Sequence, residues 1–377
     1  MVSRIFIVTG EASGDLHGAH LALALRKLQA DVELVGVGGE HMRAAGVTLL
    51  SGLERVDGIG VLGLTQIRKG LANLRTLKQY LEKEAFDAIV LIDNPGLNLR
   101  LAKIASRFGH RIIYYIAPQI WAWGRRRIHV IKRTIRRVLV ILPFEKAMYD
   151  AVDVPCDYVG HPLLDSMEPS YDPRDVRRKL GLHEEGLVVG LLPGSRIHEV
   201  ESLLPEMLQA VKFIQSQYPD IQSVIGQARS ITDELVAGII EQTNVTVQNI
   251  SHQSNDVMAA SDLLLVASGT ATLQAALIGT PMIIAYRMSW PTYWVAKLIG
   301  LVKHIGLVNL VAGKGIVPEL LQGDAVASRL SDEALLLLNN RTLYDEMRES
   351  FREVRAKMGT SGASERAAQA ILTECQA

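Results

Sequence analysis

The architecture of this chain is indicated most clearly by Val188-Val189-Gly190-Leu191-Leu192-Pro193-Gly194-Ser195-Arg196, which a helical pattern from Glu199 to Gln215 follows. An apolar run that ends in Pro-Gly-Ser-Arg before an amphipathic pattern predicts a buried strand whose loop opens onto a helix N-terminus. The first backbone N–H groups of a helix lack intrahelical partners, so we expect them to point outward and attract anions. Arg196 adds a planar charged fork that suits phosphate oxygens.

A second stretch of the same kind lies downstream. Leu263-Leu264-Leu265-Val266-Ala267 runs into Ser268-Gly269-Thr270-Ala271-Thr272, and a helical pattern continues through Ile278. Either loop alone could simply cap its helix. Together, on parallel strands, they favour a diphosphate site at the carboxyl edge of a sheet. The candidate residues are Ser195, Arg196, Ser268, Gly269 and Thr270. Neither loop has the Walker pattern or the dinucleotide Gly-x-Gly-x-x-Gly pattern.

Composition limits the class of protein. The 377 residues exceed what one hydrophobic core normally serves, so two domains are expected. Lys plus Arg and Asp plus Glu both number 40, which removes the global charge argument for a nucleic-acid partner. Cys156 and Cys375 indicate neither a disulfide framework nor a metal cluster, and they favour a reducing cytoplasm. The N-terminal apolar run meets Glu11 and Asp15 at once, so it predicts a first strand rather than a signal peptide.

Strand and helix patterns alternate along both halves, which predicts mostly parallel sheets covered on both faces. The fold class is therefore α/β, with two Rossmann-like, doubly wound domains that face a cleft. We expect an N-terminal domain at 1–165 and a C-terminal domain at 186–342. The charged segment Asp165 to Glu185 is typical of a linker. Helical patterns within 343–377 could pack back onto the first domain, which the sequence alone does not decide. The predicted strands are Ile5–Thr9, Glu33–Val37, Ala88–Ile92, Ile112–Ile116, Val138–Leu142, Leu187–Leu192, Ser223–Gly226, Val245–Asn249, Leu263–Ala267 and Met282–Tyr286.

Polar residues follow several strands of the first half. The loop Gly10-Glu11-Ala12-Ser13-Gly14-Asp15 would let a ligand approach the backbone, although for Asp15 a favourable interaction with the helix dipole is the better explanation. Asp93 directly follows the predicted strand Ala88–Ile92 and could accept a proton from an attacking hydroxyl. It could also be an Asx-type turn residue before Pro95. Trp121 and Trp123 could pack internally or form a wall for a sugar or an acyl chain. His161 is expected to be a satisfied turn residue.

Three segments combine basic and apolar residues. They are Arg125 to Arg137, Gln66 to Leu81, and Trp290 to Val302. The first carries no acid within it, so an anionic membrane surface is one interpretation of its charge. Burial of the apolar stripes in the core is the other. No apolar run reaches the roughly 18 to 20 residues that span a bilayer, so any membrane contact is expected to be peripheral.

The residues quoted so far, in their order along nearly the whole chain, resemble the lipid-A-disaccharide synthase family of two-Rossmann-domain, GT-B type glycosyltransferases. The matching stretches also include Leu142-Pro143-Phe144-Glu145-Lys146, Gly160-His161, Asn309 with Leu310, and Pro318-Glu319-Leu320-Leu321-Gln322. The resemblance implies transfer of a 2,3-diacylglucosamine unit from its UDP ester to 2,3-diacylglucosamine 1-phosphate, forming a β-1,6 bond and releasing UDP. It implies an inverting reaction without metal or cofactor, at the cytoplasmic face of the inner membrane. A homodimer is one arrangement that the sequence leaves open.

Roles follow from the resemblance. Asp93 matches the catalytic aspartate, Arg196 and the Ser268 to Thr270 loop would hold the leaving diphosphate, Asn309 would lie near the donor, and Glu319 would pair with ribose hydroxyls. The chain departs from the family pattern at Gly96-Leu97, Gln66 and Gln274. Because of these departures, one alternative is that the chain is a catalytically silent paralogue that binds UDP-sugar or lipid. A UDP-sugar epimerase or another UDP-GlcNAc transferase is a further alternative.

Overall fold

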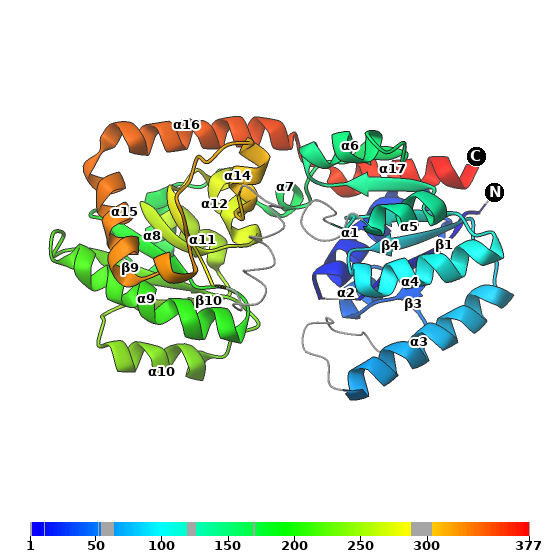
Figure 1. Cartoon of the computed structure of the whole chain (residues 1–377), viewed down its shortest axis with the longest axis horizontal. Helices are drawn as coiled ribbons and strands as arrows, with labels where there is room; N and C mark the ends of the chain where they lie inside the picture. The colour runs from blue at the N-terminus through cyan, green and yellow to red at the C-terminus, as the bar shows by residue number, and fades with distance from the viewer. Residues whose placement is uncertain are drawn as a thin grey trace. The chain divides into compact units, whose positions relative to one another are not determined.

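The computed structural model describes residues 2–10, 12–51, 53, 64–118, 126–168, 170–287 and 304–376. The chain divides into two compact units. Unit 1 is Met1–Ser166 with Met358–Ala377, and unit 2 is Met167–Lys357. Each unit contains one parallel sheet with helices on its faces (Figure 1). The prediction of an α/β protein with two Rossmann-like halves is confirmed.

Unit 1 is built on a seven-stranded sheet in the order β3-β2-β1-β4-β5-β6-β7. Its strands are β1 (Arg4–Thr9), β2 (Glu33–Val37), β3 (Thr48–Leu49), β4 (Ala88–Ile92), β5 (Ile112–Tyr115), β6 (Arg137–Val140) and β7 (Cys156–Tyr158). Every residue of β4 is buried, because helices cover both faces of a parallel sheet. Thr9 of β1 pairs with Ile92 of β4, so the loops after these two strands begin side by side.

Two helical layers bury the two faces of this sheet. One core cluster joins the strands to α3 (Leu64–Lys83), α4 (Pro95–Ala105), α5 (Arg126–Thr134) and α6 (Pro143–Asp150). The other joins them to α1 (Ala12–Leu28), α2 (Glu40–Ala44) and the C-terminal α17 (Ala363–Gln376). The last helix of the chain therefore completes the core of the first unit, where Ala367, Ala368 and Ile371 are all 0% exposed.

The entry into α17 is fixed by side chains of the first unit. The Asp165 carboxylate accepts hydrogen bonds from the backbone amides of Gly362, Ala363 and Ser364, which caps the helix N-terminus. Arg366 donates to the carbonyls of Val159, Thr360 and Ser361. Asp165 lies in α7 (Leu163–Ser166), so the segment around it is part of the folded unit.

Unit 2 contains a six-stranded parallel sheet in the order β10-β9-β8-β11-β12-β13. Its strands are β8 (Val188–Leu192), β9 (Gln222–Gln227), β10 (Gln248–Ser251), β11 (Leu263–Ala267), β12 (Met282–Tyr286) and β13 (Glu319–Leu321). Its helices are α8 (Pro173–Leu180), α9 (Ile197–Gln215), α10 (Asp233–Thr243), α11 (Ser254–Ala260), α12 (Thr270–Ile278), α14 (Leu307–Ala312), α15 (Ala327–Asn339) and α16 (Arg341–Met358). Among the described residues, no helix has the length and apolar character needed to cross a bilayer.

The predicted linker Asp165 to Glu185 is wrong over α8. Asp172 caps this helix by accepting from the Arg174 amide, Pro173 takes the first turn, and Gly181 ends it in the left-handed conformation. Within it, Arg177 is only 7% exposed and donates to the Ala260 carbonyl and to the Asp262 carboxylate. The dense charges concealed a short amphipathic helix whose apolar positions are few.

Candidate functional site

Unit 2 has a pocket of about 340 Å³ at the carboxyl ends of its strands. Leu192, Gly226 and Ala267, at or near the ends of β8, β9 and β11, contribute to its wall. Both loops that the sequence singled out open into it. Of the residues predicted to bind diphosphate, Ser195, Arg196, Ser268, Gly269 and Thr270 line the pocket. Ligands of parallel α/β sheets bind at this edge, so the location suits a nucleotide.

The first loop does not offer its backbone amides as expected. The N–H groups of Ser195 and Arg196 donate to Oε2 of Glu199 at 3.1 and 3.2 Å, and the Arg196 guanidinium donates to Oε1 at 3.0 Å. Gly194 makes this possible, because its φ is +120° and an added Cβ would lie 2.5 Å from Glu199 Oε2. The prediction of outward-pointing, unpaired amides is wrong for these two residues, because a carboxylate from the first turn of α9 already binds them.

The second loop is different. The amides of Gly269, Thr270 and Ala271 at the start of α12 make no hydrogen bond to any residue that the structure describes. A Cβ added to Gly269 would meet nothing within 4 Å, so a ligand can approach the backbone there. Free amides and the positive end of the helix dipole together form an anion-binding site. The groups in this pocket that are free to bind an anion are therefore the N-terminus of α12 and the side chain of Arg196.

Gln274 also lines this pocket, one helical turn after Thr270. Its Nε2 donates to Asn255 Oδ1 at 3.2 Å, which orients the amide. From the sequence, Gln274 stood out only as a departure from the family pattern. Its i, i+4 relation to Thr270 was the available signal, because residues at that spacing share one helix face.

Asn309 and Glu319 do not line the pocket. The Glu319 carboxylate accepts from the amides of Ile305 and Gly306 and from Asn309 Nδ2, at 2.6 to 3.1 Å. Asn309 is 0% exposed, and its Oδ1 accepts from the amides of Ile316 and Val317. These side chains thus connect α14, β13 and the segment before α14. Glu319 is connected to the pocket only through Ile305. The Ile305 amide donates to Glu319, and its carbonyl accepts from the Ser268 hydroxyl at 3.4 Å.

Asp93 lies at the carboxyl end of β4 in unit 1. It and Asn94 have φ angles of 49° and 39°, a left-handed conformation that Asn and Asp tolerate better than most residues. Its carbonyl oxygen accepts from Asn98 Nδ2 at 2.7 Å and from the Tyr114 hydroxyl at 2.6 Å. The backbone of Asp93 is therefore held by buried side chains, and strain of this kind concentrates at functional sites.

The carboxyl group of Asp93 is partly exposed and has a shifted pKa. Burial raises the pKa of Asp93 above its ordinary value, and a hydrogen bond from the Asn94 amide partly opposes this rise. A raised pKa makes the carboxylate a better proton acceptor, provided that it is still ionised at the working pH. Burial also raises the pKa of Tyr114 well above its ordinary value, so its hydroxyl stays a donor to the Asp93 carbonyl.

The loop after β1 lies beside Asp93. A Cβ on Gly10 would lie 2.0 Å from Asn94 Nδ2, so only glycine allows the two loops to approach this closely. A Cβ on Gly14 would lie 3.2 Å from Thr9 Cβ, which is also a close contact, whereas Ser13 is exposed. Asp15 does not face a ligand. It is 0% exposed, and its carboxylate accepts from the amides of Gly39, His41 and Met42, which caps α2.

The remaining predicted residues either lie outside the described part of the chain or do not face the pocket or Asp93. Glu11, Trp121, Trp123, the segment Trp290 to Val302 and the side chain of Gln66 lie outside the described residues. His161 is 6% exposed and accepts from the Leu163 amide through Nδ1, as expected for a satisfied turn residue. Burial lowers the pKa of His161 to about 4, with His17 adding to the effect, so it is neutral near pH 7. No cluster of three potential metal ligands occurs in the described part of the chain.

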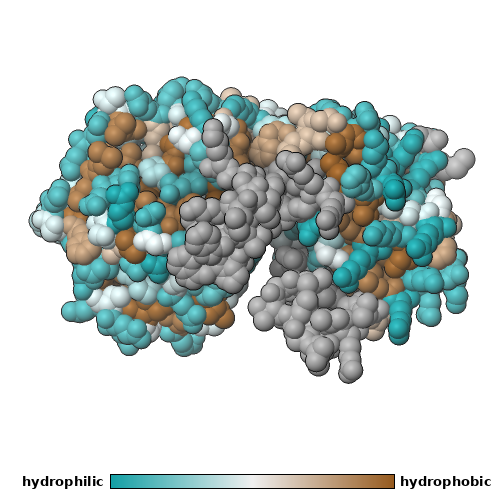
Figure 2. All heavy atoms as spheres, in the orientation of Figure 1, coloured by the Kyte–Doolittle hydropathy of each residue, from teal (hydrophilic) through white to brown (hydrophobic). Residues whose placement is uncertain are grey.

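In the described part of the segment Arg125 to Arg137, three cations form ion pairs with acids from other segments. Arg137 pairs with Glu374 and Asp157, Arg136 with Glu374, and Lys132 with Asp153. The apolar residues of the same segment, Ile131 and Ile135, are 0% and 6% exposed and belong to the core, as do Leu74 and Leu81 of α3. Figure 2 shows hydrophilic residues interspersed with hydrophobic ones over the part of unit 1 where α4 and α5 run. These buried apolar side chains are therefore part of the core and are not exposed on the surface.

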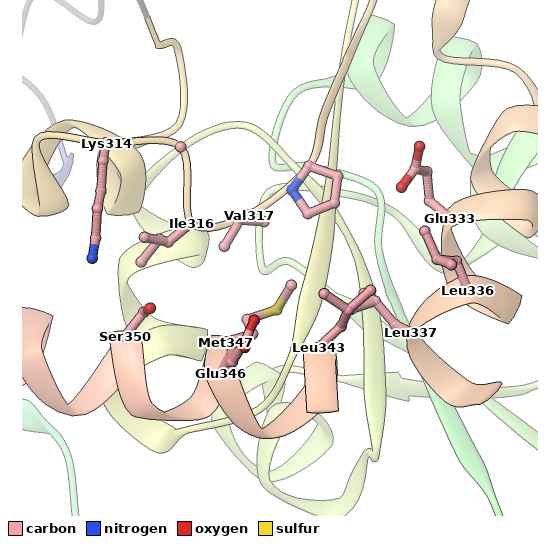
Figure 3. A pocket seen from close by; sticks show the side chains of 12 residues that line it. Lys314, Ile316, Val317, Glu333, Leu336, Leu337, Leu343, Glu346, Met347 and Ser350 are labelled. Atoms are coloured by element: carbon pink, nitrogen blue, oxygen red, sulfur yellow. The ribbon is translucent and has the colours of Figure 1, made fainter. Parts of the chain in front are cut away.

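A second pocket of unit 2, of about 480 Å³, lies between the segment Lys314 to Pro318, α15 and α16. Figure 3 shows Ile316 and Val317 on one side of it and Leu337, Leu343 and Met347 on the other. This pocket adjoins the amino end of β13, whereas the loops that carry Arg196 and Ser268 follow the carboxyl ends of β8 and β11. It contains none of the residues that the sequence assigned to nucleotide binding.

Two Rossmann-like units with an anion-ready pocket at the carboxyl edge of one sheet define the fold class shared by GT-B glycosyltransferases and UDP-sugar epimerases. Solved structures agree. A UDP-GlcNAc 2-epimerase from Neisseria meningitidis bound to UDP-GlcNAc has a TM-score of 0.64 at 12% identity, covering 98% of this chain and 100% of its own. The calicheamicin glycosyltransferase has a TM-score of 0.63 at 14% identity, covering 100% of this chain and 98% of its own. At these identities the likeness concerns the fold alone.

Sequence comparison is more specific. A family model described as lipid-A-disaccharide synthetase matches residues 5–373. A lipid-A-disaccharide synthase from Geobacter sulfurreducens is 39% identical over 370 residues, which cover 98% of this chain and 96% of the relative. The chain belongs to the lipid-A-disaccharide synthase family, and its role is synthesis of the lipid A disaccharide. The epimerase alternative is not favoured, because the epimerases resemble this chain only in fold.

Proposed function

We propose that Asp93 and the pocket of unit 2 divide the transfer reaction between them. Asp93 removes the proton from the 6-hydroxyl of 2,3-diacylglucosamine 1-phosphate. The oxygen then attacks the anomeric carbon of UDP-2,3-diacylglucosamine, whose bond to the β-phosphate oxygen breaks with inversion. UDP leaves with the bonding electron pair. The observation that carries the proposal is the pocket of unit 2, where free amides of α12 and Arg196 meet in a chain of this family.

The pocket supplies positive charge where the leaving group becomes more negative. Donors and dipoles fixed before the reaction stabilise such charge without reorganising. Arg196 and the N-terminus of α12 are suited to this, so we propose that diphosphate departure needs no metal ion. Gln274 is a candidate ligand of the donor, because its carbonyl oxygen is left to accept a hydroxyl once Nε2 is bound to Asn255.

Release of UDP tests this function. With both acylated substrates present, we expect steady UDP release and a disaccharide product, and the rate should be unchanged by excess EDTA. A substrate pair without acyl chains serves as the comparison and should react poorly. Absence of UDP release from the acylated pair would support the silent paralogue, for which Gly96, Gln66 and Gln274 are the motive. Loss of activity in EDTA would remove the metal-free part of the proposal.

The protein is also proposed to act in the cytoplasm while bound peripherally to the inner membrane, where its lipid substrates lie. Exposed cations of the described helices, among them Arg75, Lys78 and Arg133, support electrostatic attraction to an anionic surface. Exposed charges are screened over about 10 Å at 0.1 M salt. Sedimentation with anionic vesicles should therefore weaken as salt rises, and neutral vesicles serve as the control. Binding that is absent at low salt would contradict this part. The homodimer stays a prediction, which light scattering would test.

A further inference from the structure

We infer that Glu199 is a positioning residue for Arg196, holding its guanidinium ready for the diphosphate of the donor. The inference rests on the proposed function, since that function gives Arg196 its ligand. Glu199 lies in the first turn of α9 and lines the same pocket as Arg196.

The Glu199 side chain is buried and fully engaged. It is 7% exposed, and its two carboxylate oxygens have separate partners. Oε2 accepts from the amides of Ser195 and Arg196, and Oε1 accepts from Arg196 Nη1. The contacts of Oε2 form the reciprocal bond of a capping box, which stabilises a helix N-terminus in any protein. The contact of Oε1 is not part of a capping box, so it requires another explanation.

The remaining nitrogens of Arg196 are available to a ligand. Nε and Nη2 make no hydrogen bond to any residue in the described ranges, whereas Nη1 is bound to Glu199. Nη1 lies on the Cδ side of the guanidinium group, so Nε and Nη2 form the other edge, a fork that can bind two phosphate oxygens. Arg196 can thus bind Glu199 and a phosphate at the same time. The positive guanidinium would then lie between the Glu199 carboxylate and the phosphate, in contact with both negative groups.

Tethering matters because the Arg196 side chain is otherwise free to move. It is 68% exposed, and among the described residues Glu199 is the one that its guanidinium hydrogen-bonds. A long exposed side chain loses rotamer freedom when it binds a ligand, and fixing it beforehand improves affinity. Glu199 also carries a negative charge that would repel a diphosphate if the guanidinium were not between them. Positioning of Arg196 by Glu199 would raise the affinity for UDP, whereas repulsion by the Glu199 charge would lower it. A measurement of UDP affinity therefore distinguishes the two effects.

The test is a double-mutant cycle on UDP binding, measured by calorimetry with the full chain. Glu199→Gln keeps an oxygen for the two loop amides, since Gln also serves in capping boxes, but its NH₂ group cannot accept from Arg196. We expect about a tenfold loss of UDP affinity, which corresponds to about 1.4 kcal/mol. Arg196→Ala should weaken binding at least as much. Adding Glu199→Gln to Arg196→Ala should cause almost no further loss, because the residue then has nothing to position.

The outcomes separate this inference from the proposed function. If the wild type fails to bind UDP, the proposed function itself fails. If the wild type binds UDP and Glu199→Gln binds it equally or more tightly, the positioning role is wrong, as it also is if the two losses simply add. Thermal unfolding checks that each variant folds. Glu199→Asp provides a second test, because it keeps the charge but shortens the reach, and it should lose affinity as Gln does. Glu201→Gln, on an exposed position of the same helix, should leave UDP affinity unchanged.

Discussion

Replacing Asp93 with asparagine is expected to lower turnover by about 10²- to 10⁴-fold, which is the usual contribution of a general base. Asn cannot take the proton of the acceptor hydroxyl at neutral pH. The variant should still fold, because the buried contacts at this position are made by the Asp93 backbone, and Asn tolerates a φ of 49°. UDP affinity should be nearly unchanged, since the pocket proposed to bind UDP belongs to unit 2.

The pH dependence of the wild type should agree with this role. Because burial raises the pKa of Asp93, its carboxylate becomes protonated at a higher pH than an exposed aspartate. The ratio kcat/KM should therefore fall on the acid side, and the Asp93→Asn variant should lose that limb. Asp87→Asn is the matched control, as Asp87 is exposed and immediately precedes β4. Turnover retained by Asp93→Asn would remove this residue from the mechanism.

Replacing Ile371 with aspartate is expected to destabilise unit 1 by about 4 kcal/mol or more. Ile371 is 0% exposed in the core that α17 shares with α1 and the sheet. Removing a buried isoleucine costs about 2 to 5 kcal/mol, and an unpaired buried charge adds to that cost. The helix should then detach, which also breaks the pairs of Glu374 with Arg136 and Arg137. Denaturant unfolding measures the loss, and protease cleavage within α17 reports its detachment.

The same variant tests the contributions of the two units separately. UDP binding should survive Ile371→Asp, because every residue that lines the pocket proposed to bind UDP belongs to unit 2. Transfer activity should fall with the integrity of unit 1, where Asp93 lies. Gln369→Asp places the same charge on an exposed position of α17 and should be nearly neutral. Equal stability of Ile371→Asp and wild type would show that α17 contributes little to this core.

Several elements could be anticipated from residue patterns, and others could not. Continuous apolar runs such as Ala88–Ile92 and Leu263–Ala267 are strands as predicted, because buried parallel strands are apolar on both faces. β3, β7 and β13 were missed, since they have only 2 or 3 residues and too little pattern for recognition. β10 runs from Gln248 to Ser251 instead of Val245 to Asn249, because its partly exposed residues leave its ends poorly defined.

The sequence by itself determined the two α/β halves and the ends of their main strands, and therefore which loops carry Asp93, Arg196 and Ser268. Tertiary structure decided which polar groups in those loops remain free. Asp15 is bound by amides from Gly39 to Met42, and Glu319 by amides of Ile305 and Gly306. The physical reason is that a strand end depends on the local pattern of apolar residues, whereas a buried carboxylate takes its partners from segments that only folding brings near.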